Sequence, residues 1–194
     1  MKKAILAGIL ISFGCVVNLR VGGVEGAILF SLGLITILLF GFNLFTGKAG
    51  LLPTKEISIL ELFGIWIGNL AGCSITSICL SFTPLFQDVQ TAASVIANTR
   101  ISNGLITNII LGFYCGLLMY IAVTLFKKEN NPLYAIMPVA VFILSGYNHC
   151  VADMFYIISA NTPLVGWLTL IPTTIGNVLG CCFIPVLNKS AKNT

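Results

Sequence analysis

The sequence predicts an all-α integral membrane protein whose six transmembrane helices form two inverted three-helix repeats, with the second and fifth helices broken. Three observations lead to this fold class. The 194 residues are 57% hydrophobic and only 8% charged, with a mean hydropathy of +1.02, whereas soluble domains carry about a quarter charged residues. The apolar residues gather into six long segments, and one polar motif occurs once in each half of the chain.

A helix needs about 20 mainly apolar residues to cross the hydrocarbon core of a membrane. Six segments meet this requirement, at roughly 4–19, 24–47, 57–83, 103–126, 132–159 and 163–187. Turn-forming and charged residues separate them, and we expect the longest connection, about 84–101, to be a surface segment. The whole chain, 1–194, is therefore interpreted as a single transmembrane domain.

The basic residues predict how this domain lies in the membrane, because cytoplasmic loops are enriched in Lys and Arg. With six helices counted, all ten Lys and Arg residues except Arg20 and Arg100 fall on one side. That side holds both termini, and its basic residues are Lys2, Lys3, Lys48, Lys55, Lys127, Lys128, Lys189 and Lys192. We expect a multi-pass protein of the cell membrane with both termini in the cytoplasm. No basic cluster is dense enough to indicate nucleic-acid binding.

The two halves of the chain repeat one pattern. The sequence "WIGNLAGC" (66–73) in the third segment matches "TIGNVLGCC" (174–182) in the sixth, and "GFNLFTG" in the second matches "GYNHCVADMF" in the fifth. Since each half has three spans, the halves, at approximately 1–84 and 102–188, must insert in opposite orientations. Such inverted repeats are typical of transport proteins, whose substrate sites lie where two broken helices meet near the midplane.

The fifth segment contains His149, the only histidine of the chain. An ionisable residue inside a membrane is costly and usually faces a pore, although a histidine packed in the core is the alternative. A neutral imidazole can donate a hydrogen bond to an anion, or exchange a proton with it near neutral pH. Seven cysteines without a CxxC pair, together with one histidine, do not suggest a metal site, and we expect no cofactor.

Four motifs carry a resemblance to a known family: "NLFTG" (43–47), "GNLAG" (68–72), "SGYNHCVADMF" (145–155) and "TIGNVLG" (174–180). Their combination resembles the formate/nitrite transporter family, which includes formate, nitrite and hydrosulfide channels, and it covers nearly the whole chain. The resemblance implies an aquaporin-like, six-helix protomer in a lipid bilayer. It also implies a homo-oligomer, a pentamer, with one pore in each protomer.

The resemblance further implies roles for polar residues. His149 would be the central pore histidine, Thr46 would hydrogen-bond it, and Asn148 would stand beside it in the pore. Asn69 and Asn177 would tie the broken helices, which suits them better than binding substrate. Thr46 could instead bond only the backbone of its own helix.

Other roles implied by the resemblance concern the ends of the pore. Arg100 would attract anions on the outer approach, unless it is a simple surface residue. Apolar gates would lie on both sides of His149 and Thr46, although the side chains concerned could equally be ordinary helix packing. These gate residues are Phe30, Leu34, Leu44, Phe45, Met119 and Phe142.

The chain departs from the family pattern at several positions. Asn148 stands where the family commonly has Glu or Gln, Asp153 where it has an amide, and Gly116 where helix four typically has Asn. Arg100 stands where the family has a lysine. These changes leave the substrate open.

We expect a channel or proton-coupled transporter for small monovalent weak-acid anions, formate or nitrite first, with hydrosulfide as the alternative. A channel for a neutral solute such as ammonia or water is a second class. An enzyme is not expected, because Ser145, the residue that an intramembrane serine protease could pair with His149, lies in no GxS motif.

Overall fold

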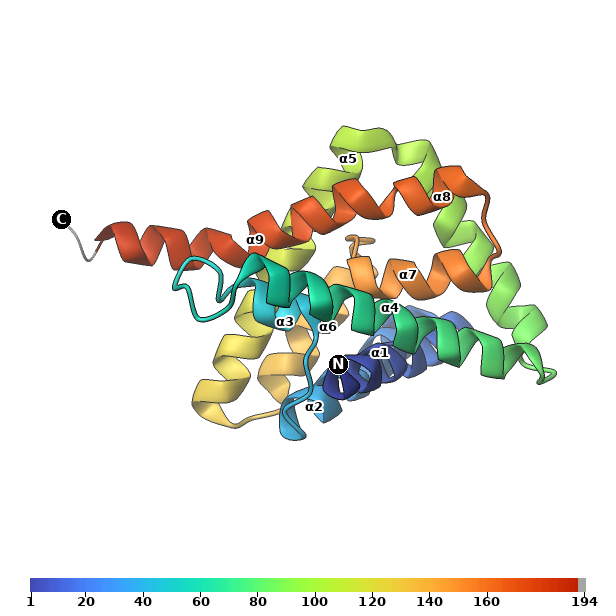
Figure 1. The fold of residues 1–194 in the computed structure, drawn as a ribbon. Coiled ribbons are helices and arrows are strands. Elements are labelled where there is room, and N and C mark those ends of the chain that lie inside the picture. Colours follow the sequence, from blue (N-terminus) through green and yellow to red (C-terminus); the bar gives the residue numbers. More distant parts are fainter. Residues whose placement is uncertain (192–194) are drawn as a thin grey trace.

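A computed structural model describes residues 1–191, so Lys192, counted above on the cytoplasmic side, lies outside the described residues. In this range every regular element is an α-helix (Figure 1). In chain order they are α1 (Lys2–Val21), α2 (Gly23–Leu39), α3 (Phe45–Ala49), α4 (Ile59–Ser81), α5 (Phe86–Glu129), α6 (Leu133–Leu144), α7 (Cys150–Ser159), α8 (Leu164–Leu168) and α9 (Leu170–Ala191).

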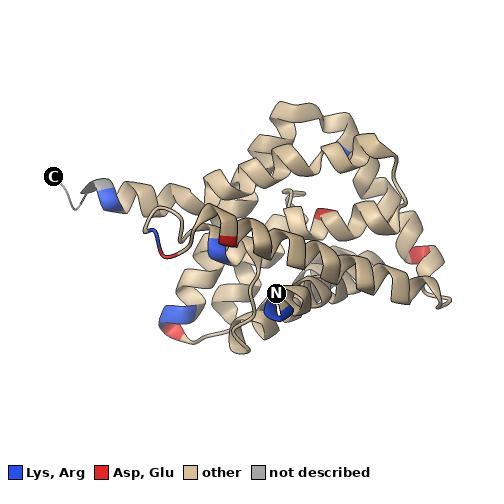
Figure 2. Ribbon diagram, viewed as in Figure 1, with Lys and Arg blue, Asp and Glu red and all other residues tan. Residues whose placement is uncertain are grey.

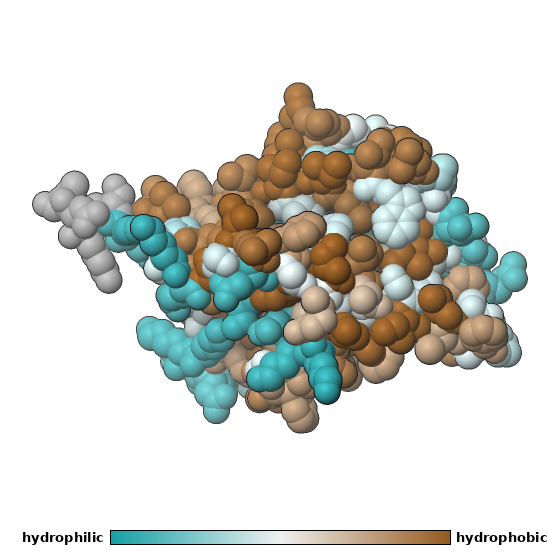
Figure 3. Space-filling view, in the orientation of Figure 1, coloured by the Kyte–Doolittle hydropathy of each residue, from teal (hydrophilic) through white to brown (hydrophobic). Residues whose placement is uncertain are grey.

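Helix length and surface composition fit a membrane environment. Within the described range, four helical segments are long and apolar enough to cross a membrane: Lys2–Val21, Ile59–Ser81, Phe86–Glu129 and Leu164–Lys189. Figure 3 shows hydrophobic side chains covering much of one face, with hydrophilic ones gathered toward its two ends. Such a surface would aggregate in water and is stable when lipid covers it. The chain is a multi-pass membrane protein.

Small residues allow the helices to pack with their backbones in contact. In the first half, α1 lies against α4, and a Cβ atom on Gly72 would collide with the Ile5 carbonyl oxygen. In the second half, α5 lies against α9, and a Cβ atom on Gly180 would collide with the Phe113 carbonyl oxygen. Close backbone approach at small residues is how helices associate when lipid removes the hydrophobic driving force.

The segment 24–47 contains two helices separated by non-helical residues, and so does the segment 132–159. α2 ends at Leu39 and α3 begins at Phe45, whereas α6 ends at Leu144 and α7 begins at Cys150. Each connection turns at a glycine with positive φ, Gly41 at 64° and Gly146 at 71°, a conformation that costs other residues energy because of their Cβ atom.

The connection at about 84–101 differs from the expected surface segment, because α5 already begins at Phe86. Val89, Ala93 and Ala97 are buried, and their spacing of four places them on one helix face. Most of the exposed residues are polar and hide this pattern from a hydropathy average. Gly104, with φ 71° and ψ −177°, interrupts α5 between this first part and the apolar remainder.

Candidate functional site

The two interruptions bring a threonine and the histidine together in the core of the molecule. Thr46 Oγ1 lies 2.9 Å from His149 Nε2, and both side chains are buried. His149 is also the N-cap residue of α7, where its Nδ1 accepts a hydrogen bond from the Ala152 N–H at 3.2 Å. Because Nδ1 accepts, a neutral imidazole carries its proton on Nε2 and donates it to Thr46 Oγ1.

An asparagine ties the start of α3 to its surroundings. Asn69 Oδ1 accepts from the Phe45 N–H at 2.9 Å, and Asn69 Nδ2 donates to the carbonyl oxygens of Ala4 at 2.8 Å and Asn43 at 3.0 Å. The bonds with Phe45 and Asn43 satisfy backbone groups between the end of α2 and the beginning of α3, and the bond to Ala4 joins them to α1. Unpaired backbone groups at membrane depth are costly, so this tie stabilises the interruption.

Asn177 makes the same set of bonds in the second half. Its Oδ1 accepts from the Cys150 N–H at 2.8 Å, and its Nδ2 donates to the carbonyl oxygens of Gly112 and Asn148, each at 2.8 Å. The bonds from Asn69 to Ala4 and from Asn177 to Gly112 both span 65 residues. Equal spacing and equal partners indicate that one local structure is built twice.

Two cysteines link the halves to each other. Cys73 Sγ donates to the Val151 carbonyl oxygen in α7 at 3.4 Å, and Cys181 Sγ donates to the Thr46 carbonyl oxygen in α3 at 3.3 Å. Each thiol therefore contacts the short helix, α7 or α3, that belongs to the other half. Neither thiol was identified from the sequence as a link, although each follows its half's asparagine, Asn69 or Asn177, by four residues and so shares its helix face.

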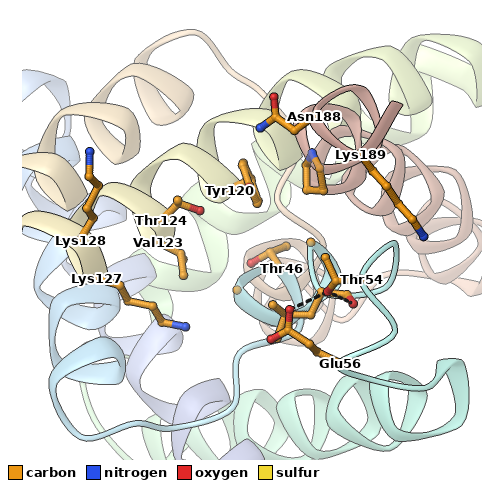
Figure 4. A pocket seen from close by; sticks show the side chains of 14 residues that line it. Thr46, Thr54, Glu56, Tyr120, Val123, Thr124, Lys127, Lys128, Asn188 and Lys189 are labelled. Atoms are coloured by element: carbon orange, nitrogen blue, oxygen red, sulfur yellow. Dashed lines mark hydrogen bonds between the residues drawn. The ribbon is translucent and has the colours of Figure 1, made fainter. Parts of the chain in front are cut away.

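A cavity of about 750 Å³ opens onto Thr46. We call it the lysine cavity, because Lys127, Lys128 and Lys189 line it together with Glu56. Figure 4 shows these side chains spread around Thr46 and Tyr120, with Glu56 accepting a hydrogen bond from Thr54 at 2.7 Å. In Figure 2 most basic residues gather toward the end of the molecule that holds the C-terminus. The cavity therefore offers an anion a net positive entrance.

A second cavity, of about 200 Å³, opens onto His149, the other partner in this hydrogen bond. We call it the Arg100 chamber; Arg100, Phe142, His149 and Asp153 are among the residues that line it. Arg100 is buried, and its Nε donates to Asp153 Oδ1 at 3.2 Å. Thus the lysine cavity reaches Thr46 and the Arg100 chamber reaches His149.

An amide pair connects the Arg100 chamber to the histidine. Asn148 Nδ2 donates to Asn108 Oδ1 at 2.8 Å, and Asn108 Nδ2 donates to the Arg100 carbonyl oxygen at 2.7 Å. The Asn108 side chain thus reaches the Arg100 backbone across the break at Gly104. Asn108 was not identified from the sequence, where an Asn inside the apolar segment 103–126 was the available signal.

The apolar residues named from the sequence fall into four places. Phe142 stacks on the His149 ring with centroids 5.6 Å apart, and Phe30 meets Phe142 edge-on at 5.8 Å. Leu34 and Leu44 line a smaller cavity of about 60 Å³ beside α3.

Phe45 lines an apolar groove that α4 and α9 form with it, and Met119 is buried within α5. Phe142 thus lies against the histidine, and Phe30 packs on Phe142. Among the described residues, no group of three or more His, Cys, Asp or Glu side chains could hold a metal ion.

Comparison with known proteins relates this arrangement to one family. A sequence model of formate/nitrite transporters matches residues 1–189. Formate channel FocA of Haemophilus influenzae is 26% identical over 147 residues, which cover 68% of this chain and 52% of that protein. Formate channel BtFdhC of Bacillus thuringiensis is 27% identical over 207 residues, which cover 90% of this chain and 79% of that protein. The chain spans about half the length of some of the curated relatives that it matches.

Solved structures share the fold. A structure described as a pentameric formate channel with formate bound superposes with a TM-score of 0.77 at 24% identity, covering 99% of this chain and 96% of that one. One described as an FNT family ion channel gives a TM-score of 0.84 at 20% identity, covering 98% and 88%. At these identities the likeness establishes the fold.

Proposed function

Because the chain belongs to the formate/nitrite transporter family, we propose that it is a channel or proton-coupled transporter for small monovalent weak-acid anions, formate or nitrite first. One observation carries this proposal: Thr46 and His149 are hydrogen-bonded, and each lines a different cavity. The names of the curated relatives as formate channels support the choice of substrate, and as channels and transporters they favour transport over enzymatic catalysis.

The proposed fold is an aquaporin-like, six-helix protomer of two inverted repeats. In it, α2 with α3 and α6 with α7 form the broken second and fifth helices, and the repeats span approximately 1–84 and 102–188. The matched bonds of Asn69 and Asn177 support this plan. With the lysine-rich end in the cytoplasm of a cell-membrane protein, both termini lie inside.

Entry begins at the lysine cavity, where the positive charge raises the local concentration of anions. A permeating anion then replaces Thr46 Oγ1 as the acceptor of the His149 Nε2–H. This hydrogen bond compensates an ion that has lost its water, which would otherwise be costly beside apolar side chains. The positive end of α7 adds to the attraction.

Proton coupling requires a second state of the histidine. A neutral imidazole has only its Nε2 proton to give, so proton transfer to an anion starts from the imidazolium, with protons on both nitrogens. In that state Nδ1 no longer accepts from the Ala152 N–H, and the cap of α7 is lost. Coupled transport would therefore weaken the first turn of α7 on each cycle, whereas hydrogen-bonded passage of the anion would not.

Apolar gates limit the passage of hydrated ions in this proposal. Phe30 and Phe142 form the gate nearest His149, and Arg100 lies on the approach from that side. Asn148 fixes the approach through Asn108. Leu34, Leu44, Phe45 and Met119 form the remainder of the gates. The protomer assembles as a homopentamer with one pore each, as the description of the pentameric formate channel suggests.

A flux panel on purified protein in liposomes tests the proposal. Formate, nitrite, hydrosulfide, ammonia and water are compared, with empty liposomes and a His149→Leu protein as controls. We expect formate or nitrite uptake well above both controls. Faster uptake of hydrosulfide than of either would reassign the substrate, and flux of ammonia or water alone would show that the protein is a neutral-solute channel.

A further inference from the structure

The two cavities differ in their balance of fixed charge. Lysines outnumber carboxylates in the lysine cavity, where Glu56 is the one acid among its lining residues. In the Arg100 chamber the lining residues with a formal charge are Arg100 and Asp153, one of each sign. An anion is therefore attracted by the first cavity, while the second offers it no net charge.

The ion pair in the chamber is buried and built into the fold. Exposure of the side chains is 9% for Arg100 and 1% for Asp153, with 3.2 Å between Nε and Oδ1. Arg100 Nη1 also donates to the Gly146 carbonyl oxygen at 3.4 Å, in the turn before α7. Because either charge alone would be costly when buried, each compensates the other.

The same pair leaves one hydrogen-bond acceptor unused. Asp153 Oδ2 is buried and has no hydrogen-bond partner in the described structure. A buried oxygen of this kind is normally satisfied. The protonated form of a weak acid has an O–H or S–H group that could donate to it, whereas the anion has none and meets a carboxylate instead.

We propose that Asp153 is a specificity-determining residue: as the built-in counterion of Arg100, it makes the Arg100 chamber exclude free anions and admit the neutral, hydrogen-bond-donating form of a small weak acid. This inference rests on the proposed function and assigns different forms of one substrate to the two cavities. Acid and anion exchange their proton with water, so the chain itself need not supply the proton.

Competition by an anion that stays ionised at neutral pH tests the role of Asp153. Thiocyanate is added to one side of liposomes sorted by orientation, and formate flux is followed. In the unmodified protein we expect thiocyanate to lower the flux from the lysine side and to change it less than about twofold from the Arg100 side. In Asp153→Asn, which frees the guanidinium, we expect about a tenfold inhibition from the Arg100 side.

The double variant Arg100→Gln with Asp153→Asn is the matched control, because it removes both charges and should again be insensitive on the Arg100 side. Sensitivity of the double variant equal to that of Asp153→Asn would mean that Arg100 is not the anion site, and would overturn the proposal. An Asp153→Asn protein that is folded and still insensitive would overturn it too.

If Asp153→Asn fails to assemble, the sidedness of thiocyanate inhibition in the unmodified protein decides the test. Equal inhibition by thiocyanate from both sides refutes the role of Asp153, while inhibition from the lysine side alone supports it. Formate flux in the absence of thiocyanate separates the two proposals. Formate flux that thiocyanate inhibits equally from both sides rejects the role of Asp153 only. Absence of flux for every weak acid rejects the proposed function and this inference with it.

Discussion

The two interruptions of the chain share a supporting structure and differ in their chemistry. Asn69 and Asn177 make matching bonds in the two halves. The residue that precedes the short helix is Leu44 before α3 and His149 before α7. Four residues later stand Lys48 and Asp153 respectively. The repeated asparagines satisfy the backbone groups at the two interruptions. The residues that differ between the halves supply the hydrogen-bonding and charged side chains.

The largest expected effect comes from breaking the repeated support. Asn69→Leu and Asn177→Leu each remove three hydrogen bonds and leave buried backbone groups unpaired. We expect either change to cost more than about 3 kcal/mol and to lower the thermal unfolding midpoint in detergent to a similar degree. Asn98→Leu, on the exposed face of α5, serves as the control. If only one of the two variants were destabilised, the supports would not be equivalent.

An intermediate effect is expected from giving the second half the chemistry of the first. His149→Leu removes both the hydrogen bond to Thr46 and the cap of α7, and we expect formate flux to fall about 10- to 100-fold, the range for a hydrogen bond to a charged group. His149→Asn is the informative partner, because asparagine caps helices well and still donates.

Flux measured across pH with His149→Asn separates the two ways of passage. Retained flux with no response to a pH gradient would indicate that hydrogen bonding is enough and that the imidazole provides proton coupling. Complete loss of flux in a folded His149→Asn assembly would assign the imidazole an essential part. Acid-coupled flux that is unchanged in both variants would eliminate His149 from the mechanism.

The smallest effect is expected at the thiols that link the halves. Cys73→Ala and Cys181→Ala should each lower the unfolding free energy by about 0.5–1 kcal/mol, because S–H groups are weak donors. The loss should be larger for Cys181, whose contacts of 3.2 and 3.3 Å are shorter than those of Cys73 at 3.6 and 3.4 Å. Cys79→Ala, at an exposed cysteine, should be neutral in the same unfolding measurement.

Composition and motifs were enough to predict a membrane protein of this family, because hydropathy and the repeated Asn-containing motifs are properties of the sequence itself. The helical start of α5 was not predicted. Val89, Ala93 and Ala97 mark one buried face, but the polar residues between them lower the average hydropathy of the window below that of a span.

Contacts between residues far apart in the sequence could not be predicted from it. Arg100 and Asp153 are 53 residues apart, and neither residue alone indicates the other as its partner. Arg100 was expected to attract anions on the approach to the pore, and that role stays a prediction. Its side chain pairs with Asp153, while Asn108 bonds its carbonyl oxygen across the break at Gly104. The distribution of charge between the cavities therefore required the three-dimensional structure.

The Thr46–His149 contact bears on the rate of transport. A side-chain hydrogen bond of this kind contributes about 1 kcal/mol, and rotamer changes are far faster than the movement of packed helices. We infer that swinging the threonine hydroxyl aside and tilting the Phe142 ring would open the part of the passage beside His149 without any helix rocking. Such an opening would favour a transport rate typical of a channel over the slower rate of an alternating-access carrier.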